Sequence, residues 1–283
     1  MRKIVGALGG LIAFALVWEG YKAVGNPEGT TVLGVKILPR ADDLSMPHLL
    51  TVAQRLGRPE LTGGRPVWQV VFDACLFTLG VTAVGFVAGT AIGFVLATLM
   101  QRFRVVERGL LPYVVLSQTV PLVALAPLIA GWSGALSFGP YPWQDWMTVS
   151  VIASYLAFFP VAVGLLRGLQ SPSAAGVELM RSYAAGRAKI LWKLRIPASF
   201  PFLFTALKIA APAAVVGAII GELPSSIQDG LAGAILNFNQ YYITSPESLW
   251  ATNIIAALLG ILFFVVVALA ERLLVRRAPE NVA

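Results

Sequence analysis

The sequence of 283 residues contains one cysteine, one histidine and few charged residues. Because Cys75 is alone, an intrachain disulfide is excluded, and His48 without a cysteine cluster leaves no ligand set for zinc. The phosphate-binding loop G-x-x-x-x-G-K-[ST] of P-loop ATPases is missing. The apolar stretches also contain no pair of carboxylates and no Ser/His set. We therefore expect a protein with no metal site and no cofactor of its own, and not an enzyme.

What the sequence has in excess is apolar residues. Hydrophobic residues make up 57% of the chain and charged residues only 12%, with a mean hydropathy of +0.77, which is outside the range of soluble domains. The net charge of +7 would suit nucleic acid only if the basic residues gathered on a soluble face. Here they lie between apolar runs, so we expect a lipid bilayer as the partner and no nucleic acid.

Six apolar stretches are long enough to cross a membrane. Residues 74–100, for example, include 27 positions without a charge, which as a helix exceeds the ~30 Å of the hydrocarbon core. The first stretch, which ends near Val24, has an alternative reading as a secretory signal peptide. We predict an all-α, polytopic membrane protein with six transmembrane helices. The stretches are 4–24, 74–100, 110–132, 146–166, 202–221 and 249–270.

The charges predict the orientation. If both termini are cytoplasmic, 15 of the 21 Lys and Arg residues lie on the cytoplasmic side, and ten of the 14 acids lie outside. The positive-inside rule selects this arrangement. Residues 1–66 then form the first transmembrane helix and an external loop. Residues 67–283 form a five-helix core, with a cytoplasmic loop at about 168–200.

Small residues recur every four positions in the second stretch. Gly85, Gly89, Gly93 and Ala97 give one smooth helical face on which a neighbouring backbone can approach closely. Two interpretations are open: helix packing within the chain, or a seam between two copies.

The third stretch is interrupted by proline. Pro121 frees the carbonyl four residues before it, which lipid tolerates only where protein or water satisfies that group. Gln118 and Thr119 lie beside this proline, so we expect a kink with polar groups that point inward. They would either line a pathway or form an interhelical hydrogen bond.

A spaced motif lies in the basic loop. Glu178 is followed six residues later by Ala184, and ten residues after that come Leu194 and the pair Ile196-Pro197. This spacing resembles the cytoplasmic signature of ABC-importer permeases, written EAA, three residues, G, nine residues, I-x-L-P. Leu and Met replace the two alanines, Ala184 replaces the glycine, and Ile-Pro replaces Leu-Pro. Without the motif, a basic amphipathic helix resting on anionic lipid would explain the loop.

The resemblance covers nearly the whole chain. Arg-Ile-Pro-Ala-Ser-Phe-Pro at 195–201, Gly221-Glu222, and Gln118 with Pro121 are similar to permease subunits of nitrate, sulfonate, taurine, pyrimidine and riboflavin importers. This resemblance implies that residues 67–283 are a permease core in a bacterial plasma (inner) membrane. It also implies a second copy or a related permease, two ATPase subunits that carry ATP and Mg, and an extracytoplasmic substrate-binding protein. The substrate class, and the choice between homodimer and heterodimer, remain open.

The resemblance also implies two sets of functional residues. The first set would couple the chain to the ATPase: Glu178, Leu179, Met180, Ala184, Ala185, Gly186 and Pro197. The second set would lie along the translocation path: Gln118, Thr119, Glu222, Asn237 and Asn239. The alternative function is an ATP-independent channel or secondary transporter. The chain shows no internal repeat of the kind that such transporters often have.

Overall fold

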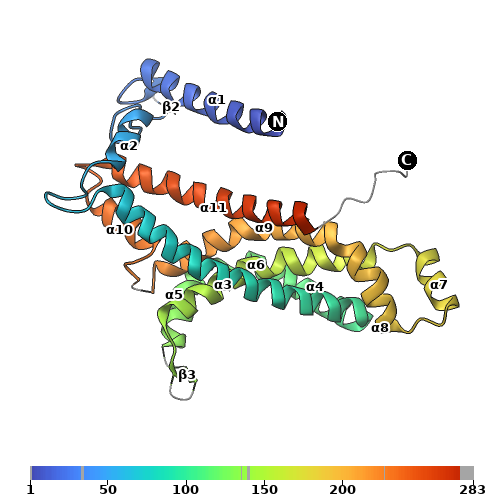
Figure 1. Ribbon diagram of the computed structural model, residues 1–283. Helices are drawn as coiled ribbons and strands as arrows, with labels where there is room; N and C mark the ends of the chain where they lie inside the picture. Colours follow the sequence, from blue (N-terminus) through green and yellow to red (C-terminus); the bar gives the residue numbers. More distant parts are fainter. Residues whose placement is uncertain (1, 33–34, 135, 139–140, 226, 275–283) are drawn as a thin grey trace. The chain divides into compact units, whose positions relative to one another are not determined.

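The computed structural model describes residues 2–32, 35–134, 136–138, 141–225 and 227–274, and helices dominate it (Figure 1). This confirms the predicted α class. The chain forms two compact units, one of residues 1–73 and 234–255 and the other of residues 74–233 and 256–283. Helices α3 (Val67–Arg102), α10 (Leu231–Gln240) and α11 (Pro246–Leu274) contribute residues to both units.

The first unit is built from helix α1 and the polar segment that follows it. Its other elements are the antiparallel strands β1 and β2 and a short helix α2. Several side chains of α1 and all those of the two strands lie outside the described residues. The bounds are α1 Arg2–Val24, β1 Thr30–Val32, β2 Val35–Leu38 and α2 Leu49–Leu56.

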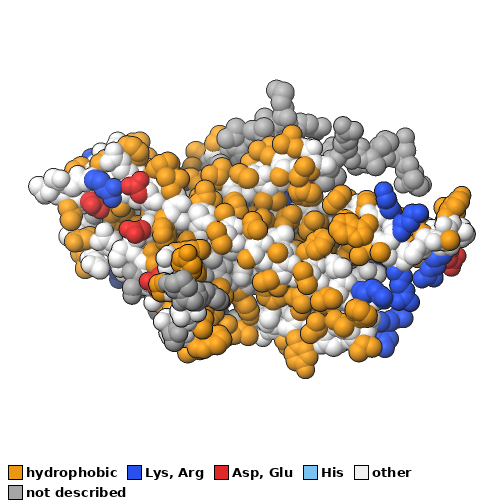
Figure 2. Space-filling model, turned by 60° about the horizontal axis from the view of Figure 1, so that its bottom comes forward, with side chains coloured by type: hydrophobic (Ala, Val, Ile, Leu, Met, Phe, Trp, Pro, Cys, Tyr) orange, Lys and Arg blue, Asp and Glu red, His pale blue; other side chains and the backbone are white. Residues whose placement is uncertain are grey.

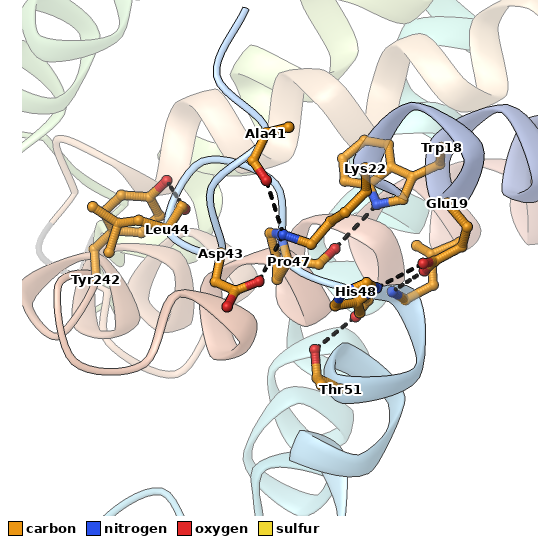
Figure 3. A network of polar contacts seen from close by, with 11 residues as sticks. Trp18, Glu19, Lys22, Ala41, Asp43, Leu44, Pro47, His48, Thr51 and Tyr242 are labelled. Atoms are coloured by element: carbon orange, nitrogen blue, oxygen red, sulfur yellow. Dashed lines mark hydrogen bonds and ion pairs between the residues drawn. The ribbon is translucent and has the colours of Figure 1, made fainter. Parts of the chain in front are cut away.

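A network of polar contacts ties α1 to this segment (Figure 3). Lys22 Nζ lies 2.6 Å from a carboxylate oxygen of Asp43, and this hydrogen bond lowers the pKa of Asp43. Glu19 accepts hydrogen bonds at 2.7 Å from the backbone N–H of Leu49, the first residue of α2, and contacts His48 Nδ1 at 2.7 Å. The two charged side chains near the end of α1 therefore bind protein groups.

The second unit holds the remaining helices. Helix α6 packs against α9 along most of its length. Strands β3 and β4 form a two-residue hairpin between α5 and α6. The bounds are α4 Arg104–Leu116, η1 Ser117–Thr119, α5 Leu122–Ser133, β3 Ser137–Phe138, β4 Tyr141–Pro142, α6 Asp145–Gln170, α7 Ala174–Ser182, α8 Arg187–Ile190, the π-helical η2 Leu191–Arg195 and α9 Ile196–Glu222.

Four helices of the described residues are long and apolar enough to cross a membrane: α3, α6, the continuous helix Arg187–Glu222 and α11. A fifth candidate is the pair α4–η1 and α5, which bends by 100° at Pro121. Helix α1 has 23 residues and corresponds to the first predicted stretch. The total of six spans stays a prediction, and the basic pair Arg276-Arg277 of the tail lies outside the described residues.

Two predicted boundaries are wrong. The fifth apolar helix does not start after Pro201, because helical structure runs without a break from Arg187 to Glu222. Pro201 lies inside α9, and a π-helical turn precedes α9 at Leu191–Arg195. The segment 223–248 is not only loop, because it contains α10.

Close contact through glycine holds α3 against α6. A Cβ atom added to Gly85, Gly89 or Gly93 would collide with α6, because all three glycines lie directly on its backbone. The prediction of packing within the chain is therefore confirmed. In lipid there is little hydrophobic drive between helices, so van der Waals contact of this kind supplies much of the association. The added Cβ atoms at Gly85, Gly89 and Gly93 would lie 2.5, 2.6 and 2.8 Å from the carbonyl oxygens of Ser150, Ser154 and Phe158, respectively.

The α9 side of α6 repeats this arrangement. Gly164 and Gly168 of α6 meet Ala206 and Ser199 of α9, while Gly217 of α9 lies against the backbone of Ala153. Helix α6 therefore packs between α3 and α9, with backbone contacts to both. Large apolar side chains on the outer faces of α3 and α11 are exposed, as expected for surfaces that lipid covers.

We expect Gly89→Val to destabilise the α3–α6 contact by about 1–3 kcal/mol, because the added methyl groups overlap the backbone of Ser154. Gly80→Val on the same helix is the matched control, because a Cβ at Gly80 meets nothing within 4 Å. The measurement is the thermal unfolding midpoint of both variants in detergent. Equal midpoints for the two would contradict this packing.

Candidate functional site

The predicted coupling residues lie on a compact projection of the second unit. We call residues 173–190 the coupling segment; it comprises α7, a tight turn and α8, and it extends past the ends of α4 and α6 (Figure 1). Ser173 caps its start, because its Oγ accepts a hydrogen bond from the backbone N–H of Gly176 at 3.2 Å. The short helix α7 therefore has a fixed beginning although it projects from the bundle.

The turn after α7 fixes its end. The N–H of Ala185 donates to the carbonyl of Met180 at 3.0 Å, and the N–H of Ala184 donates to the carbonyl of Arg181 at 2.8 Å. These two bonds form a Schellman motif, whose left-handed residue is usually glycine. Here that residue is Ala184, with φ of 54°. The glycine position of the resembled signature therefore coincides with the backbone position that favours glycine.

The segment exposes a mixed surface. Leu179 is 59% and Tyr183 77% exposed, and Glu178, Ala184 and Gly186 are also exposed. Met180 is half-buried, and Ala185 is buried under the turn. Lys and Arg side chains gather at this end of the unit, beside a broad hydrophobic surface (Figure 2). Exposed apolar side chains next to small residues suit contact with another protein surface.

Beyond the turn, the segment continues directly into a membrane helix. Helix α8 passes through the π-helical turn η2 into α9, so Arg187–Glu222 is one helix of 36 residues. Pro197, the last predicted coupling residue, lies exposed in the first turn of α9, away from the other six. Arg195 joins the η2 turn to the end of α6, because its guanidinium donates a hydrogen bond to the carbonyl of Leu169 at 2.7 Å.

At the other end of the same helix, Glu222 is buried. Its side chain is 1% exposed, and Thr78 of α3 donates to its Oε1 at 2.7 Å. Its Oε2 accepts from the N–H of Ala232 at 2.9 Å, and the N–H of Leu231 donates to the Thr78 hydroxyl at 2.9 Å. Two otherwise unpaired N–H groups at the start of α10 are thus satisfied by side chains of α3 and α9.

Gly230 permits this arrangement. A Cβ there would overlap the Glu222 carboxyl group, so only glycine lets the chain pass so close before α10 begins. Neither Gly230 nor Thr78 was identified from the sequence, since a threonine within an apolar run carries no signal of its distant partner. The sequence did offer a signal for α10, because Asp229-Gly230 stands before the apolar run that starts at Leu231.

The other predicted path residues lie elsewhere. Gln118 and Thr119 are exposed in η1, at the bend between α4 and α5, and the Thr119 hydroxyl donates to the carbonyl of Leu116 at 2.8 Å. The carbonyl of Ser117, which Pro121 leaves without its helical donor, accepts a hydrogen bond from the hydroxyl of Tyr155.

Asn237 and Asn239 lie on α10, the first half-buried and the second exposed. No hydrogen bond joins Glu222 to Gln118 or Thr119 among the described residues. The role of the five residues in translocation stays a prediction.

Comparison with known proteins agrees with this geometry. The family model described as the binding-protein-dependent transport system inner membrane component matches residues 89–278. The formylaminopyrimidine transport permease of Halalkalibacterium halodurans is 32% identical over 199 residues, which cover 70% of this chain and 74% of the relative. The riboflavin transport system permease of Chloroflexus aurantiacus is 29% identical over 226 residues, 78% and 80% of the two chains.

A putative aliphatic sulfonates transport permease of Bacillus subtilis is 24% identical over 275 residues, which cover 97% of this chain and 89% of the relative. The matched family range contains the coupling segment and Glu222 together with the α3–α6–α9 contact from Gly89 onward. By this match and these identities, the chain belongs to the binding-protein-dependent transport system inner membrane components, a family of multi-pass permeases of ABC transporters.

Proposed function

We propose that this chain is the transmembrane subunit of an ATP-driven importer, with six spans, both termini in the cytoplasm, and a separate ATPase that binds the coupling segment. One observation carries the proposal most: the capped, exposed segment has its left-handed turn at the signature's glycine position and continues into a 36-residue membrane helix. The partner ATPase supplies the ATP and Mg site, and this chain supplies the path.

The first step is contact with the ATPase. Leu179 and Tyr183 offer apolar surface, while Ala184 and Gly186 lack bulk, so a groove of the partner can close over the turn. Glu178 is exposed on the same helix and is available to pair with a basic group of that groove. Because both ends of α7 are hydrogen-bonded, the segment presents one defined shape to its partner.

The second step is transmission. The 36-residue helix joins the coupling segment to Glu222 without an intervening loop, so a shift of the segment can be passed along continuous helical backbone. Helices α6 and α9 are in backbone contact at their glycines, and this contact opposes movement of one helix without the other. We therefore expect α6 and α9 to move as one body, as in rigid-body alternating access.

The third step takes place at the start of α10. Glu222 is the last residue of α9, and through it and Thr78 the movement of α9 is passed to α10, which carries Asn237 and Asn239. We propose that Gln118 and Thr119 at the bend, and separately Asn237 and Asn239 on α10, belong to the path, and that Glu222 positions the start of α10. An extracytoplasmic binding protein would deliver a small organic substrate, such as those in the names of the relatives, to a pair of permeases.

The rival function is a channel or secondary transporter that works alone. It would leave the exposed surface of the coupling segment without a partner. The two functions differ in whether a P-loop ATPase binds the chain.

We expect Ala184→Trp to leave membrane insertion intact and to abolish co-purification of the ATPase, because the indole would stand where the turn must meet its partner. Ala184→Ser is the matched control, since it keeps a side chain at the same left-handed φ without the bulk. The measurement is the amount of P-loop ATPase retained on the tagged permease. Equal retention by both variants, or no ATPase on the unaltered chain, contradicts the assignment.

We expect Glu222→Ala to reduce substrate uptake at unchanged expression, because the N–H of Ala232 and the Thr78 hydroxyl lose their acceptor, at a cost of about 1–3 kcal/mol for each buried group left unpaired. Thr78→Val, which removes the second contact to α10, should act in the same direction. Unimpaired uptake by both variants would show that the hold on α10 is not needed for transport.

A further inference from the structure

A basic hollow lies at the end of the second unit that carries the coupling segment. Its volume is about 1080 Å³, and it is bordered by the ends of α3 and α6, by α4 over its whole length and by the η2 turn. Four arginines line it: Arg102, Arg104, Arg108 and Arg195. A second hollow of about 530 Å³ shares Arg102 and Arg195 and adds Arg181 and Arg187.

These charges are poorly compensated. Arg104 and Arg108 are four residues apart on α4, a spacing at which like charges repel. Glu107 is the acid among the lining residues, and its Oε1 already accepts a hydrogen bond from Gln170 at 2.8 Å. Among the described residues, the ion pairs are Lys22–Asp43, His48–Glu19, Arg65–Asp73 and Lys208–Glu271, so none involves the arginines of the hollow.

The wall of the hollow changes character along α4. Arg104, Arg108, Leu111 and Val115 all line it, at spacings of four, three and four residues, which place them on one stripe of the helix. The stripe is basic at the start of the helix and apolar farther along. Val115 is 49% and Leu116 57% exposed, so the apolar part faces outward as well.

We propose that this hollow binds an anionic phospholipid, with the phosphate headgroup among Arg104, Arg108, Arg102 and Arg195 and an acyl chain along Leu111 and Val115. A free phosphate would use the arginines but leave the apolar wall unexplained. An acidic protein surface would likewise match the charge and not the apolar stripe. Basic pockets between membrane helices on the cytoplasmic side are known to suit such headgroups.

The lipid would hold α4 against the end of α6. It would neutralise the repulsion between the arginines where Glu107 and Gln170 already join these two helices. The assignment to the cytoplasmic leaflet rests on the proposed orientation, whereas the binding itself depends only on the hollow. Lipid binding and ATPase binding are therefore separate measurements, and either can fail without the other.

The test uses the full-length chain in a neutral detergent. It is titrated with phosphatidylglycerol, with phosphatidylcholine of the same acyl chains, and with inorganic phosphate, and bound lipid is counted by native mass spectrometry. We expect the double variant Arg104→Gln/Arg108→Gln to bind phosphatidylglycerol about thirtyfold more weakly, because each basic residue near an anionic lipid strengthens binding about fivefold. Arg104→Lys/Arg108→Lys should retain most of the binding.

The matched control is Lys189→Gln/Lys193→Gln, which removes the same charge from exposed residues at the same end that do not line either hollow. We expect it to bind phosphatidylglycerol within about twofold of the unaltered chain. The proposal is overturned if this control weakens binding as much as the arginine variant, if phosphatidylcholine binds equally well, or if inorganic phosphate at the lipid's concentration displaces the lipid.

Discussion

Backbone-level contact between helices is the constraint on which this structure depends. Helices in lipid gain little from hydrophobic burial against one another, so α3 and α9 approach α6 through glycine, where side chains would keep them apart. Three glycines of α3 meet three carbonyls of α6 that are four residues apart, and glycine also brings α9 close to α6. The result is that α6 is in backbone contact with both α3 and α9.

The same constraint explains how two distant features work together. The coupling segment and the Glu222 contacts lie at opposite ends of one continuous helix, which packs closely on α6. In the proposed mechanism, a displacement of the coupling segment is passed along this helix to Glu222. The buried carboxylate of Glu222 joins α9 to the start of α10 and to α3, because it accepts hydrogen bonds from the N–H of Ala232 and from the hydroxyl of Thr78.

Features that depend on local chemistry could be predicted from the sequence. The four-residue spacing of Gly85, Gly89 and Gly93 indicated a packing face, and Pro121 indicated a break, because both act through their own backbone. The roles of Thr78 and Gly230 could not be predicted, since their partner Glu222 is distant in sequence. The start of the long helix at Arg187 is not visible in the sequence, because Pro201 favours a helix boundary and yet lies inside α9.

The position of the coupling segment relative to the membrane is the central claim, and cysteine labelling tests it most directly. Cys75 is the chain's one cysteine, so Ser182→Cys in a Cys75→Ser background gives a single reporter on the exposed last turn of α7. A membrane-impermeant maleimide should label it only from the cytoplasmic side, and bound ATPase should protect it. Labelling from the outside of intact cells would contradict the account.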